Sequence, residues 1–351
     1  MTSTSRAATG YAATTAAGPL QPWTFERRAL RPDDVAVRVT FCGVCHTDLH
    51  SVSAPRAEGD AAPLVPGHEF VGEVVEVGPE VTGFAVGDPV AVGNIVDSCG
   101  VCAMCTAGQE NCCLEFPTLT YGGVDRVDGT TTYGGYCDLY VVREAFVYHR
   151  PAHLDPAAVA PLMCAGVTVW EPLRAWGVGP GSKVGVVGLG GLGHLAVKLA
   201  AALGAEVTVF TRTADKADGA RALGAAHVVV STDDDAMAAV AGTLDLVVDC
   251  VPTTHPLEPY LATVRMDGTL CSVGDLGPIS LQTMALLGRR RLSSSGSAGR
   301  RSTQEMLDFC GGHGIVADVE VLPSAQVQTA FERLARGDVR YRFSLDLSDL
   351  G

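Results

Sequence analysis

The sequence lacks any long apolar run. No stretch of about 18 or more uncharged apolar residues occurs in its 351 residues, so it contains no segment that could cross a bilayer as a helix. Residues 1–20 are small and polar, with no compact apolar block behind a basic start, and they do not resemble a secretory signal. These absences predict a soluble, cytoplasmic protein without a membrane partner.

Positive charge is scarce as well. The sequence has 25 Lys and Arg residues against 39 Asp and Glu residues, and its formal net charge is -14. Such a charge repels a phosphate backbone. The short run Arg289-Arg290-Arg291 is expected at a solvated surface or a domain junction. We therefore expect no nucleic-acid partner.

Cysteine, in contrast, is plentiful. Twelve cysteines occur in a long chain without a recognisable secretory signal. Disulfide scaffolds belong to small secreted domains, so this usage favours metal or redox chemistry in a reducing compartment. The spacing of the cysteines, described below, indicates metal binding.

The length of the chain predicts two domains, because a single hydrophobic core stops growing at about 250–300 residues. Residues 20–150 are dense in Gly and Pro and contain short β-branched runs at 35–39 and 71–77, which alternate with period two. This half of the chain therefore predicts a β-rich domain with short antiparallel strands and long loops.

From residue 183 onward the pattern changes to strands that alternate with helices. The expected strands are 183–187, 206–210, 227–230 and 244–249, with helices at 194–203 and up to Gly224. Such alternation predicts an α/β fold with a parallel, doubly wound sheet. We expect the last stretch, from about 303, to rejoin the first domain. Its predicted elements are helices at 304–310 and 325–335 and a strand at 341–346.

A glycine-rich turn connects the strand at 183–187 to the next helix. Gly188, Gly190 and Gly193 form a G-x-G-x-x-G pattern in this context. The glycines allow a tight turn and a close approach of the backbone to a pyrophosphate, which the N–H groups at the helix N-terminus attract. We predict a dinucleotide site here. Gly191 and Leu192 belong to the same turn, and Val273 and Gly274 are also predicted to bind the cofactor.

The end of the second strand indicates which dinucleotide binds. This segment holds Thr211, Arg212, Thr213 and Lys216, with no acid where the strand ends. A carboxylate there would bind the ribose hydroxyls and repel a 2′-phosphate, so hydroxyls and cations favour NADP over NAD. The alternative is that Thr213 only caps the following helix and Lys216 is solvated.

Four cysteines lie close together in one turn-rich loop. They are Cys99, Cys102, Cys105 and Cys113, in a C-x2-C-x2-C-x7-C pattern. Four thiolates form a closed tetrahedral cage, which predicts a structural zinc ion. Cys112 is an alternative fourth ligand.

A second set of metal-ligand residues is dispersed along the chain. It contains either Cys42 or Cys45, together with His68 and Cys164. Three protein ligands leave the exchangeable position that a catalytic zinc needs, and Cys2His is a known set for alcohol oxidation. The spacing alone does not choose between Cys42 and Cys45.

Several motifs together resemble the zinc-dependent medium-chain dehydrogenases, in particular the branch of cinnamyl alcohol dehydrogenases and broad-range aldehyde reductases. They run in family order over almost the whole chain: Cys-Gly-Val-Cys-His-Thr-Asp-Leu-His (42–50), Val-Pro-Gly-His-Glu (65–69), the four-cysteine loop, Tyr-Gly-Gly-Tyr (133–136), Cys-Ala-Gly-Val-Thr (164–168), Gly-Leu-Gly-Gly-Leu-Gly-His (188–194) and Val-Arg-Tyr-Arg-Phe (339–343). The resemblance implies a GroES-like catalytic domain over 1–158, completed by 303–351, and a Rossmann domain over 159–302. It also implies a homodimer.

The resemblance assigns the metal ligands. The family's zinc thiolate comes directly before His-Thr-Asp, which implies Cys45 as the ligand and Cys42 as a core thiol. His68 and Cys164 complete the set. Glu69 resembles the family carboxylate that can replace water on the metal.

The remaining roles also follow from the family. Asp48 resembles the carboxylate that orients the ligand histidine, a common arrangement around metals. Thr47 and His50 stand at the positions of the proton relay, and Thr168 is expected near the nicotinamide. The implied reaction is hydride transfer between NADP(H) and an aldehyde/primary alcohol pair, with two zinc ions per chain.

Two other functions remain as alternatives. One is reduction of a conjugated C=C or C=N bond on the same fold, and the other is zinc or nucleotide sensing without catalysis. The presence of both Thr47 and His50 favours carbonyl chemistry.

The resemblance is weakest after Leu292. Residues 293–301 replace a more apolar stretch of the family, and Ile95 is expected at the pocket wall. Arg300 or Arg301 facing the substrate would favour a polar or anionic molecule, whereas exposure to solvent leaves the prediction unchanged.

Overall fold

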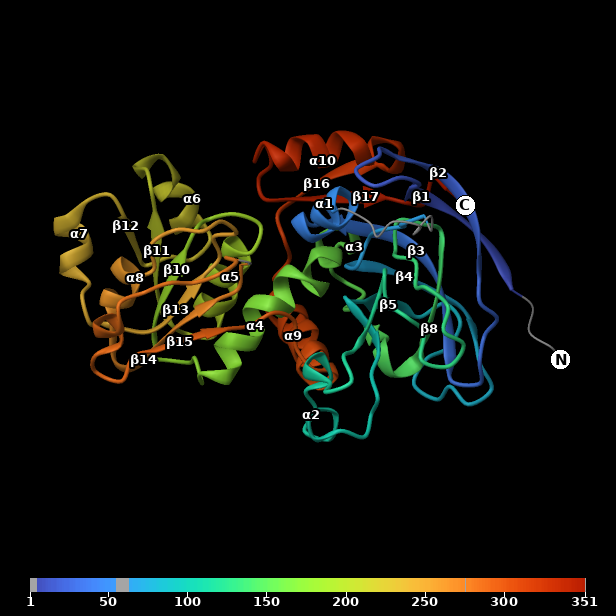
Figure 1. Ribbon diagram of the computed structural model, residues 1–351, viewed down its shortest axis with the longest axis horizontal. Helices are drawn as coiled ribbons and strands as arrows, with labels where there is room; N and C mark the ends of the chain where they lie inside the picture. Colours follow the sequence, from blue (N-terminus) through green and yellow to red (C-terminus); the bar gives the residue numbers. More distant parts are fainter. Residues whose placement is uncertain (1–4, 55–62, 275, 351) are drawn as a thin grey trace. The chain divides into compact units, whose positions relative to one another are not determined.

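The computed structural model of the protein describes residues 5–54, 63–274 and 276–350 (Figure 1). The chain divides into two compact units. The first unit comprises Met1–Cys164 and Ala298–Gly351, and the second unit comprises Ala165–Ser297. Within the described residues, no helix is both long and apolar enough to cross a membrane.

A seven-stranded sheet forms the centre of the first unit. Along one path its strands are β16 (Val319–Pro323), β17 (Arg342–Asp346), β3 (Asp34–Val44), β4 (Phe70–Val77), β5 (Pro89–Val92) and β9 (Tyr148–His149), and β8 (Leu139–Arg143) pairs with β3. All pairs are antiparallel except β16 with β17. The period-two runs at 35–39 and 71–77 lie in β3 and β4, so both predicted strands are confirmed.

Smaller elements surround this sheet. Two-stranded ribbons are formed by β1 (Arg6–Ala13) with β2 (Leu20–Arg27), and by β6 (Ile95–Asp97) with β7 (Thr118–Leu119). The α-helices are α1 (His46–Ser53), α2 (Ala103–Thr106), α3 (Pro156–Val159), α9 (Arg300–His313) and α10 (Val327–Ala335). Short 3-10 helices are η1 (Glu110–Cys112), η2 (Glu144–Phe146), η3 (Ala160–Met163) and η6 (Ser324–Gln326).

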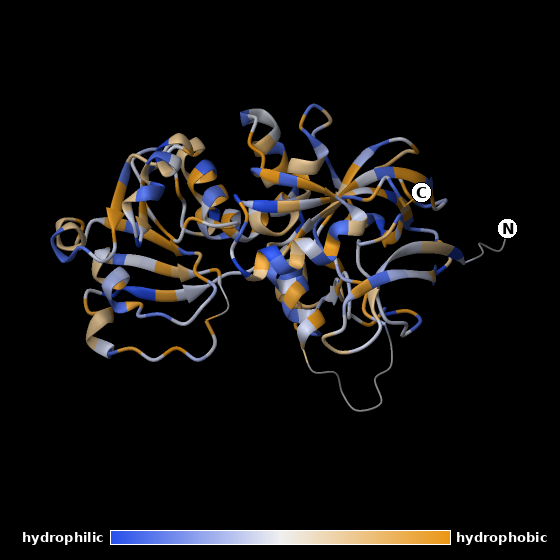
Figure 2. Ribbon diagram, turned by 90° about the horizontal axis from the view of Figure 1, so that it is seen from above, coloured by the Kyte–Doolittle hydropathy of each residue, from blue (hydrophilic) through white to orange (hydrophobic). Residues whose placement is uncertain are grey.

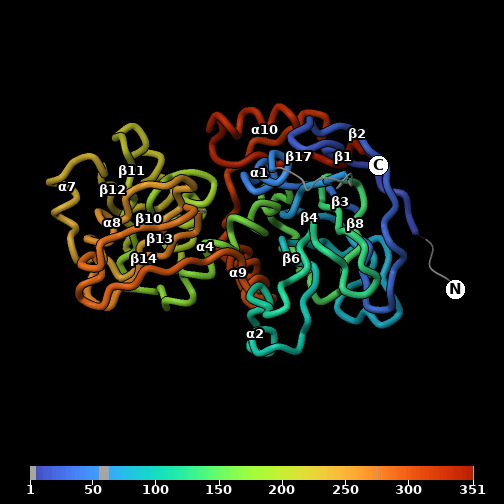
Figure 3. The backbone as a smooth tube through the Cα atoms, in the orientation of Figure 1, coloured from blue at the N-terminus to red at the C-terminus, as the bar shows by residue number. Residues whose placement is uncertain are grey.

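The last part of the chain is built into this first unit. Strand β17 lies beside β3 in Figure 3, with Phe343 opposite Val44 and Leu345 opposite Cys42. Phe343 and Leu345 are completely buried and belong to the same core cluster as the side chains of β3 and β4. Residues about 300 positions apart in the sequence therefore share one hydrophobic core.

The second unit contains a six-stranded parallel sheet in the order β12-β11-β10-β13-β14-β15. Its strands are β10 (Lys183–Val187), β11 (Glu206–Thr211), β12 (His227–Val230), β13 (Leu244–Asp249), β14 (Val264–Ser272) and β15 (Arg291–Ser294). Its helices are α4 (Ala165–Ala175), α5 (Gly193–Ala202), η4 (Ala214–Lys216), α6 (Ala217–Ala222), α7 (Asp234–Ala239), α8 (Glu258–Thr263) and η5 (Thr283–Leu286). The order reverses between β10 and β13, as in doubly wound nucleotide-binding folds. The predicted α/β fold class is confirmed.

The sequence pattern located the buried strands of this sheet accurately. Strands β10, β12 and β13 have the predicted bounds, because their apolar runs are interrupted sharply by polar residues. Runs of hydrophobic residues along the strands are visible in Figure 2. The sequence pattern did not reveal α4, α7, α8, β14 or β15. Helices α7 and α8 and strand β15 are short and begin with a charged residue, α4 contains Pro172, and Arg265, Asp267 and Gly268 interrupt the apolar residues of β14. Helix α9 begins at Arg300 instead of 304, since its first turn is polar.

The packing of β17 predicts that the first unit depends on the C-terminal segment. Phe343→Ala should lower the free energy of unfolding by about 3–5 kcal/mol, because it leaves a cavity in the core. Val321→Ala on the neighbouring β16 is the control, since Val321 is 45% exposed, and it should change the free energy by at most about 0.5 kcal/mol. Urea unfolding followed by circular dichroism measures both. Equal losses in the two variants would contradict this packing.

Candidate metal centres and nucleotide site

Three potential metal ligands converge in the first unit. The ligand atoms of Cys45, His68 and Cys164 all lie within 4.8 Å of one another. The Cys164 sulfur is 3.2 Å from His68 Nε2 and 3.9 Å from the Cys45 sulfur. Cys45 lies at the N-terminus of α1, His68 lies just before β4, and Cys164 follows η3. The fold thus gathers three loop ends around one point.

A buried carboxylate holds this donor set in place. Asp48 Oδ1 is 2.9 Å from His68 Nδ1 and accepts a hydrogen bond from the Gly67 backbone N–H at 3.0 Å. Asp48 Oδ2 accepts bonds from the Cys45 N–H at 3.1 Å and from the Tyr136 hydroxyl at 3.2 Å. Asp48 is completely buried. Because Nδ1 is directed to a carboxylate, Nε2 is the ring nitrogen left to face a metal.

The chemistry of the donor set suits a metal ion. The pKa of the Cys45 thiol is well below its ordinary value because of hydrogen bonding with Cys164 and His68, despite an opposing effect of burial. A thiolate is the form of cysteine that binds zinc, and two cysteines with one histidine match a catalytic zinc set. The residues present therefore fit a zinc ion with one exchangeable position.

The structure also shows which of Cys42 and Cys45 belongs to the donor set, a choice that the spacing alone did not make. Cys42 is completely buried in the hydrophobic core of the first unit, and burial raises its pKa well above the ordinary value. Cys45, three residues later, reaches the donor set. The difference arises because β3 includes Cys42 and continues to Val44, so that the chain leaves the sheet just before Cys45.

Glu69, which is expected to reach the metal, is paired with an arginine in the structure. Both of its carboxylate oxygens bond with the Arg342 guanidinium of β17, one of them at 2.5 Å. Burial raises the pKa of Glu69 to about 8, and Arg342 acts in the opposite direction. Burial lowers the pKa of Arg342, but the opposite effect of Glu69 and the nearby thiols is larger. The pKa of Arg342 therefore lies above its ordinary value, and the guanidinium stays charged. Exchange of Glu69 onto the metal stays a prediction.

Sequence reasoning assigned no role to Arg342 or Tyr121. Arg342 lies within the Val-Arg-Tyr-Arg-Phe motif, and an Arg at the start of a buried strand was the available signal. The Tyr121 ring lies 5.8 Å from the His68 ring, and its hydroxyl is 3.2 Å from Ser51 Oγ. No local pattern marks Tyr121, because its contacts are made by residues distant in the sequence.

The predicted relay residues lie on α1. Thr47 Oγ1 is 3.6 Å from the Cys45 sulfur, and the His50 ring lies 6.1 Å from the His46 ring. Thr47 and His50 are both exposed. A hydroxyl beside the donor set and an exposed imidazole one turn further along the helix suit proton transfer, and their roles stay predictions.

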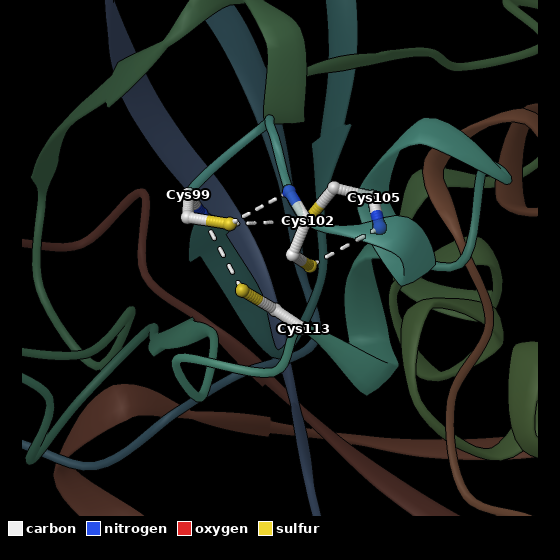
Figure 4. Close-up of side chains that lie close together, drawn as sticks. All are labelled: Cys99, Cys102, Cys105 and Cys113. Carbon is white, nitrogen blue, oxygen red and sulfur yellow. Dashed lines mark hydrogen bonds between the residues drawn. The ribbon is translucent and has the colours of Figure 1, made fainter.

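A separate four-cysteine cluster occupies the loop from Cys99 to Cys113. The four sulfurs lie within 4.8 Å of one another and point toward a common centre (Figure 4). Backbone N–H groups of Cys105 and Leu114 donate to the Cys102 sulfur and lower its pKa to about 6. Cys112 is exposed and lies outside the cluster. This geometry fits a closed tetrahedral zinc site.

The glycine loop of the second unit has the form that a dinucleotide requires. Gly188 has a φ of +85°, and a Cβ atom on Gly193 would lie 1.9 Å from the Gly188 carbonyl oxygen. A Cβ atom on Gly190 would meet nothing within 4 Å, so the backbone is open there. The loop leads through Gly191 and Leu192 into α5. A bound pyrophosphate could therefore approach this backbone closely.

Polar groups follow the end of β11 as expected. Arg212, Thr213 and Lys216 are exposed, and Thr211 Oγ1 donates to the Thr213 carbonyl oxygen at 3.2 Å. The Thr213 hydroxyl bonds with Asp215 and makes no capping hydrogen bond to the backbone of η4. Thr213 thus occupies the N-cap position of η4 without a side-chain cap, whereas Lys216 is exposed, as the alternative expected.

The other predicted residues are placed as follows. Thr168 on α4 accepts a hydrogen bond from Ser297 N–H at 3.3 Å. Val273 and Gly274 directly follow β14, at the carboxyl edge of the parallel sheet. Ile95 begins β6 and is buried.

Both arginines of the divergent stretch are exposed to solvent. The Arg300 guanidinium lies over the Phe146 ring at 5.5 Å and 3.9 Å from a Glu110 oxygen. Arg301 is exposed as well. Neither residue gives a reason to change the expected substrate class.

Comparison with known proteins supports the class that this fold and these donor sets define. Residues 31–152 match the model of the alcohol dehydrogenase GroES-like domain, and residues 191–311 match the zinc-binding dehydrogenase model. The chain belongs to the zinc-binding alcohol dehydrogenase family of oxidoreductases, and the predicted family is confirmed.

Relatives and solved structures cover almost the whole chain. A probable formaldehyde dehydrogenase of Bacillus subtilis is 46% identical over 93% of this chain and 94% of its own. An NADP-dependent alcohol dehydrogenase of Mycolicibacterium smegmatis is 44% identical over 97% of this chain and 98% of its own. A cinnamyl alcohol dehydrogenase structure from Sorghum bicolor has a TM-score of 0.92 at 45% identity, with 98% of each chain covered. The structure of a cinnamyl alcohol dehydrogenase from Helicobacter pylori, complexed with NADP(H), has a TM-score of 0.89 at 35% identity. It covers 98% of this chain and 99% of its own.

The four-cysteine cluster predicts that substitutions of the neighbouring residues Cys112 and Cys113 affect the zinc content differently. Cys113→Ser should remove one zinc ion per chain, because it takes a thiolate from a site without spare ligands. Cys112→Ser should leave the zinc content unchanged, since Cys112 lies outside the cluster. Mass spectrometry of purified, acid-released metal measures the content. Loss of zinc in Cys112→Ser but not in Cys113→Ser would identify Cys112 as the ligand instead.

Proposed function

We propose that this protein is a zinc-dependent, NADP(H)-linked alcohol dehydrogenase that interconverts an aldehyde and a primary alcohol. The observation that carries the proposal is the donor set of Cys45, His68 and Cys164, oriented by Asp48 through His68 Nδ1. Three protein ligands leave one coordination position for a substrate oxygen. A fully closed set of four ligands would serve structure only.

The residues in and around the donor set have separate roles in this proposal. When bound there, zinc supplies a Lewis acid for carbonyl and alcohol chemistry. Asp48 keeps the Nδ1 proton in place, so that Nε2 presents its lone pair to the metal. Arg342 gives Glu69 a charged partner, without which this buried acid would be unpaired beside the cysteine ligands.

Proton transfer is assigned to α1. The Thr47 hydroxyl, 3.6 Å from the Cys45 sulfur, would exchange a proton with the substrate oxygen. The exposed His50 imidazole would exchange that proton with solvent, and imidazole suits this task near neutral pH. Both directions of the reaction use the same two groups.

The second unit would hold the cofactor. The glycine loop, Gly188–Gly193, would take the pyrophosphate, and Arg212 and Lys216 the 2′-phosphate, with Thr168, Val273 and Gly274 near the nicotinamide. When bound, NADP(H) supplies or accepts the hydride. The NADP dependence in the name of the mycobacterial relative and the NADP(H) in the Helicobacter structure support this choice.

We also infer the setting in which the enzyme works. Its substrate would be a small aromatic, allylic or aliphatic aldehyde or alcohol, as the names of its relatives suggest. We propose a cytoplasmic homodimer, with the catalytic domain over 1–158 and 303–351 and the nucleotide domain over 159–302.

The carbonyl reaction is tested by product and by metal dependence. NADPH oxidation with benzaldehyde, cinnamaldehyde and an aliphatic aldehyde should yield alcohols and should stop after chelation. Cys45→Ser should lower kcat/KM by about a thousandfold or more, because it removes the group that holds the Lewis acid. Cys112→Ser is the control and should keep full activity. A saturated aldehyde as sole product from cinnamaldehyde, or activity surviving complete removal of metal, would contradict the proposal.

The cofactor preference is tested at the end of β11. Lys216→Ala should raise the KM for NADPH about tenfold, since it removes a charge-assisted bond to the 2′-phosphate. The KM for NADH should hardly change. Lys183→Ala is a matched control at the opposite, amino-terminal end of β10. Equal effects of Lys216→Ala on both cofactors would count against NADP recognition by this residue.

A further inference from the structure

A buried acid and an imidazole face each other at the carboxyl end of β13. Asp249, the last residue of this strand, is completely buried, and its Oδ2 atom lies 3.3 Å from His255 Nε2. The other oxygen, Oδ1, accepts a hydrogen bond from the Val251 N–H at 3.2 Å. Residues 249–255 thus form a closed loop that begins and ends at this pair.

The contact between the two side chains is favourable when one of them carries a proton at this point. His255 Nδ1 lies 2.8 Å from the Thr253 carbonyl oxygen, which can only accept, so Nδ1 carries a hydrogen. In a neutral ring, Nε2 would then turn a lone pair toward the Asp249 carboxylate. In the part of the chain that the structure describes, neither Nε2 nor Oδ2 has a hydrogen-bond partner, and their 3.3 Å contact is an ion pair when the imidazole is protonated. A proton on one of these two atoms removes the repulsion between their lone pairs.

This loop lies against the elements that are expected to bind the dinucleotide. A Cβ atom on Gly188 would lie 3.0 Å from the Val251 side chain, and one on Gly274 would lie 2.4 Å from the Val251 carbonyl oxygen. The Thr254 hydroxyl donates to the Leu276 carbonyl oxygen at 2.9 Å. Strands β10 and β13 are neighbours at the point where the strand order reverses, where doubly wound folds bind ligands.

We propose that Asp249 and His255 are positioning residues for the cofactor: their shared proton closes the loop 249–255, which holds Val251 against the glycine loop and thereby sets the affinity for NADP(H). The inference rests on the proposed function, because it assumes that the second unit binds this dinucleotide. Nothing in the hydride-transfer chemistry itself requires the pair.

The pair also predicts how affinity depends on pH. Burial raises the pKa of Asp249, which favours retention of the shared proton. Raising the pH removes this proton, the lone pairs of Nε2 and Oδ2 then face each other, and the loop opens, so affinity falls as pH rises. The other titratable groups near the pair are Cys250, Cys271 and Tyr260. Burial raises the pKa of both thiols, that of Cys271 to about 12, so neither accounts for a change near neutral pH.

Two variants test the His255 imidazole and the ionisable carboxyl group of Asp249 separately. His255→Phe keeps an aromatic ring beside Tyr260 but removes both ring nitrogens. Asp249→Asn keeps an oxygen for the Val251 N–H and provides an amide N–H that donates to a neutral His255 Nε2, so it closes the loop without a shared proton. His227→Gln is the matched control, because it removes an exposed histidine paired with Glu206 in the same sheet.

The measurement is the Kd for NADPH, obtained by fluorescence titration of the full, zinc-loaded chain from about pH 5 to about pH 10. Zinc content and thermal unfolding of each variant verify that it is folded. Wild type should bind more weakly as the pH rises. His255→Phe should raise the Kd about tenfold at neutral pH, because a buried carboxylate loses its partner. Asp249→Asn should bind like wild type at neutral pH and lose the alkaline weakening, and His227→Gln should match wild type throughout.

Several results would overturn the inference. One is an unchanged Kd in folded His255→Phe, and another is an alkaline weakening in Asp249→Asn equal to that of wild type. If His255→Phe does not fold, Asp249→Asn alone decides, through its pH profile. A wild-type chain that binds neither NADPH nor NADH would overturn the proposed function itself, whereas a binding wild type with indifferent variants would overturn only the role of this pair.

Discussion

The buried carboxylate of Asp48 is the interaction on which the metal centre depends. It accepts hydrogen bonds from two backbone N–H groups and the Tyr136 hydroxyl, and it holds the imidazole of His68. These contacts join the start of α1, the segment before β4 and the loop around Tyr136. A buried carboxylate without such donors would be strongly destabilising, so the same bonds that orient the metal ligand also stabilise the domain around it.

The two donor sets of the first unit use similar chemistry for different purposes. The cluster at Cys99–Cys113 has four thiols within one loop and leaves no position for another ligand. The set at Cys45, His68 and Cys164 has three ligands from three separate segments. Its surroundings are completed from still further away, because Arg342 of β17 reaches Glu69 beside the ligand histidine. Four ligands close the first site, whereas three leave one position open at the second.

Residues that act within a short segment were predictable. The four-cysteine cluster, the glycine loop and the strands β10, β12 and β13 depend on local spacing, apolar runs and conformational freedom at glycine, all of which are visible in the sequence. Residues whose partners lie far along the chain were missed. Tyr121 and Arg342 belong to this group, since they contact His68 and Glu69 from distant segments.

The sequence by itself determined the fold class, the family and the two groups of metal-binding residues, because ligand types and short spacings are properties of the chain. The tertiary structure alone decided which atoms meet. It buried Cys42 in the core while Cys45 reached His68, and it gave Glu69 an arginine as partner. The reason is geometric: whether a side chain near a strand end enters the core or a site depends on where the strand leaves the sheet, which only the packing of distant segments sets.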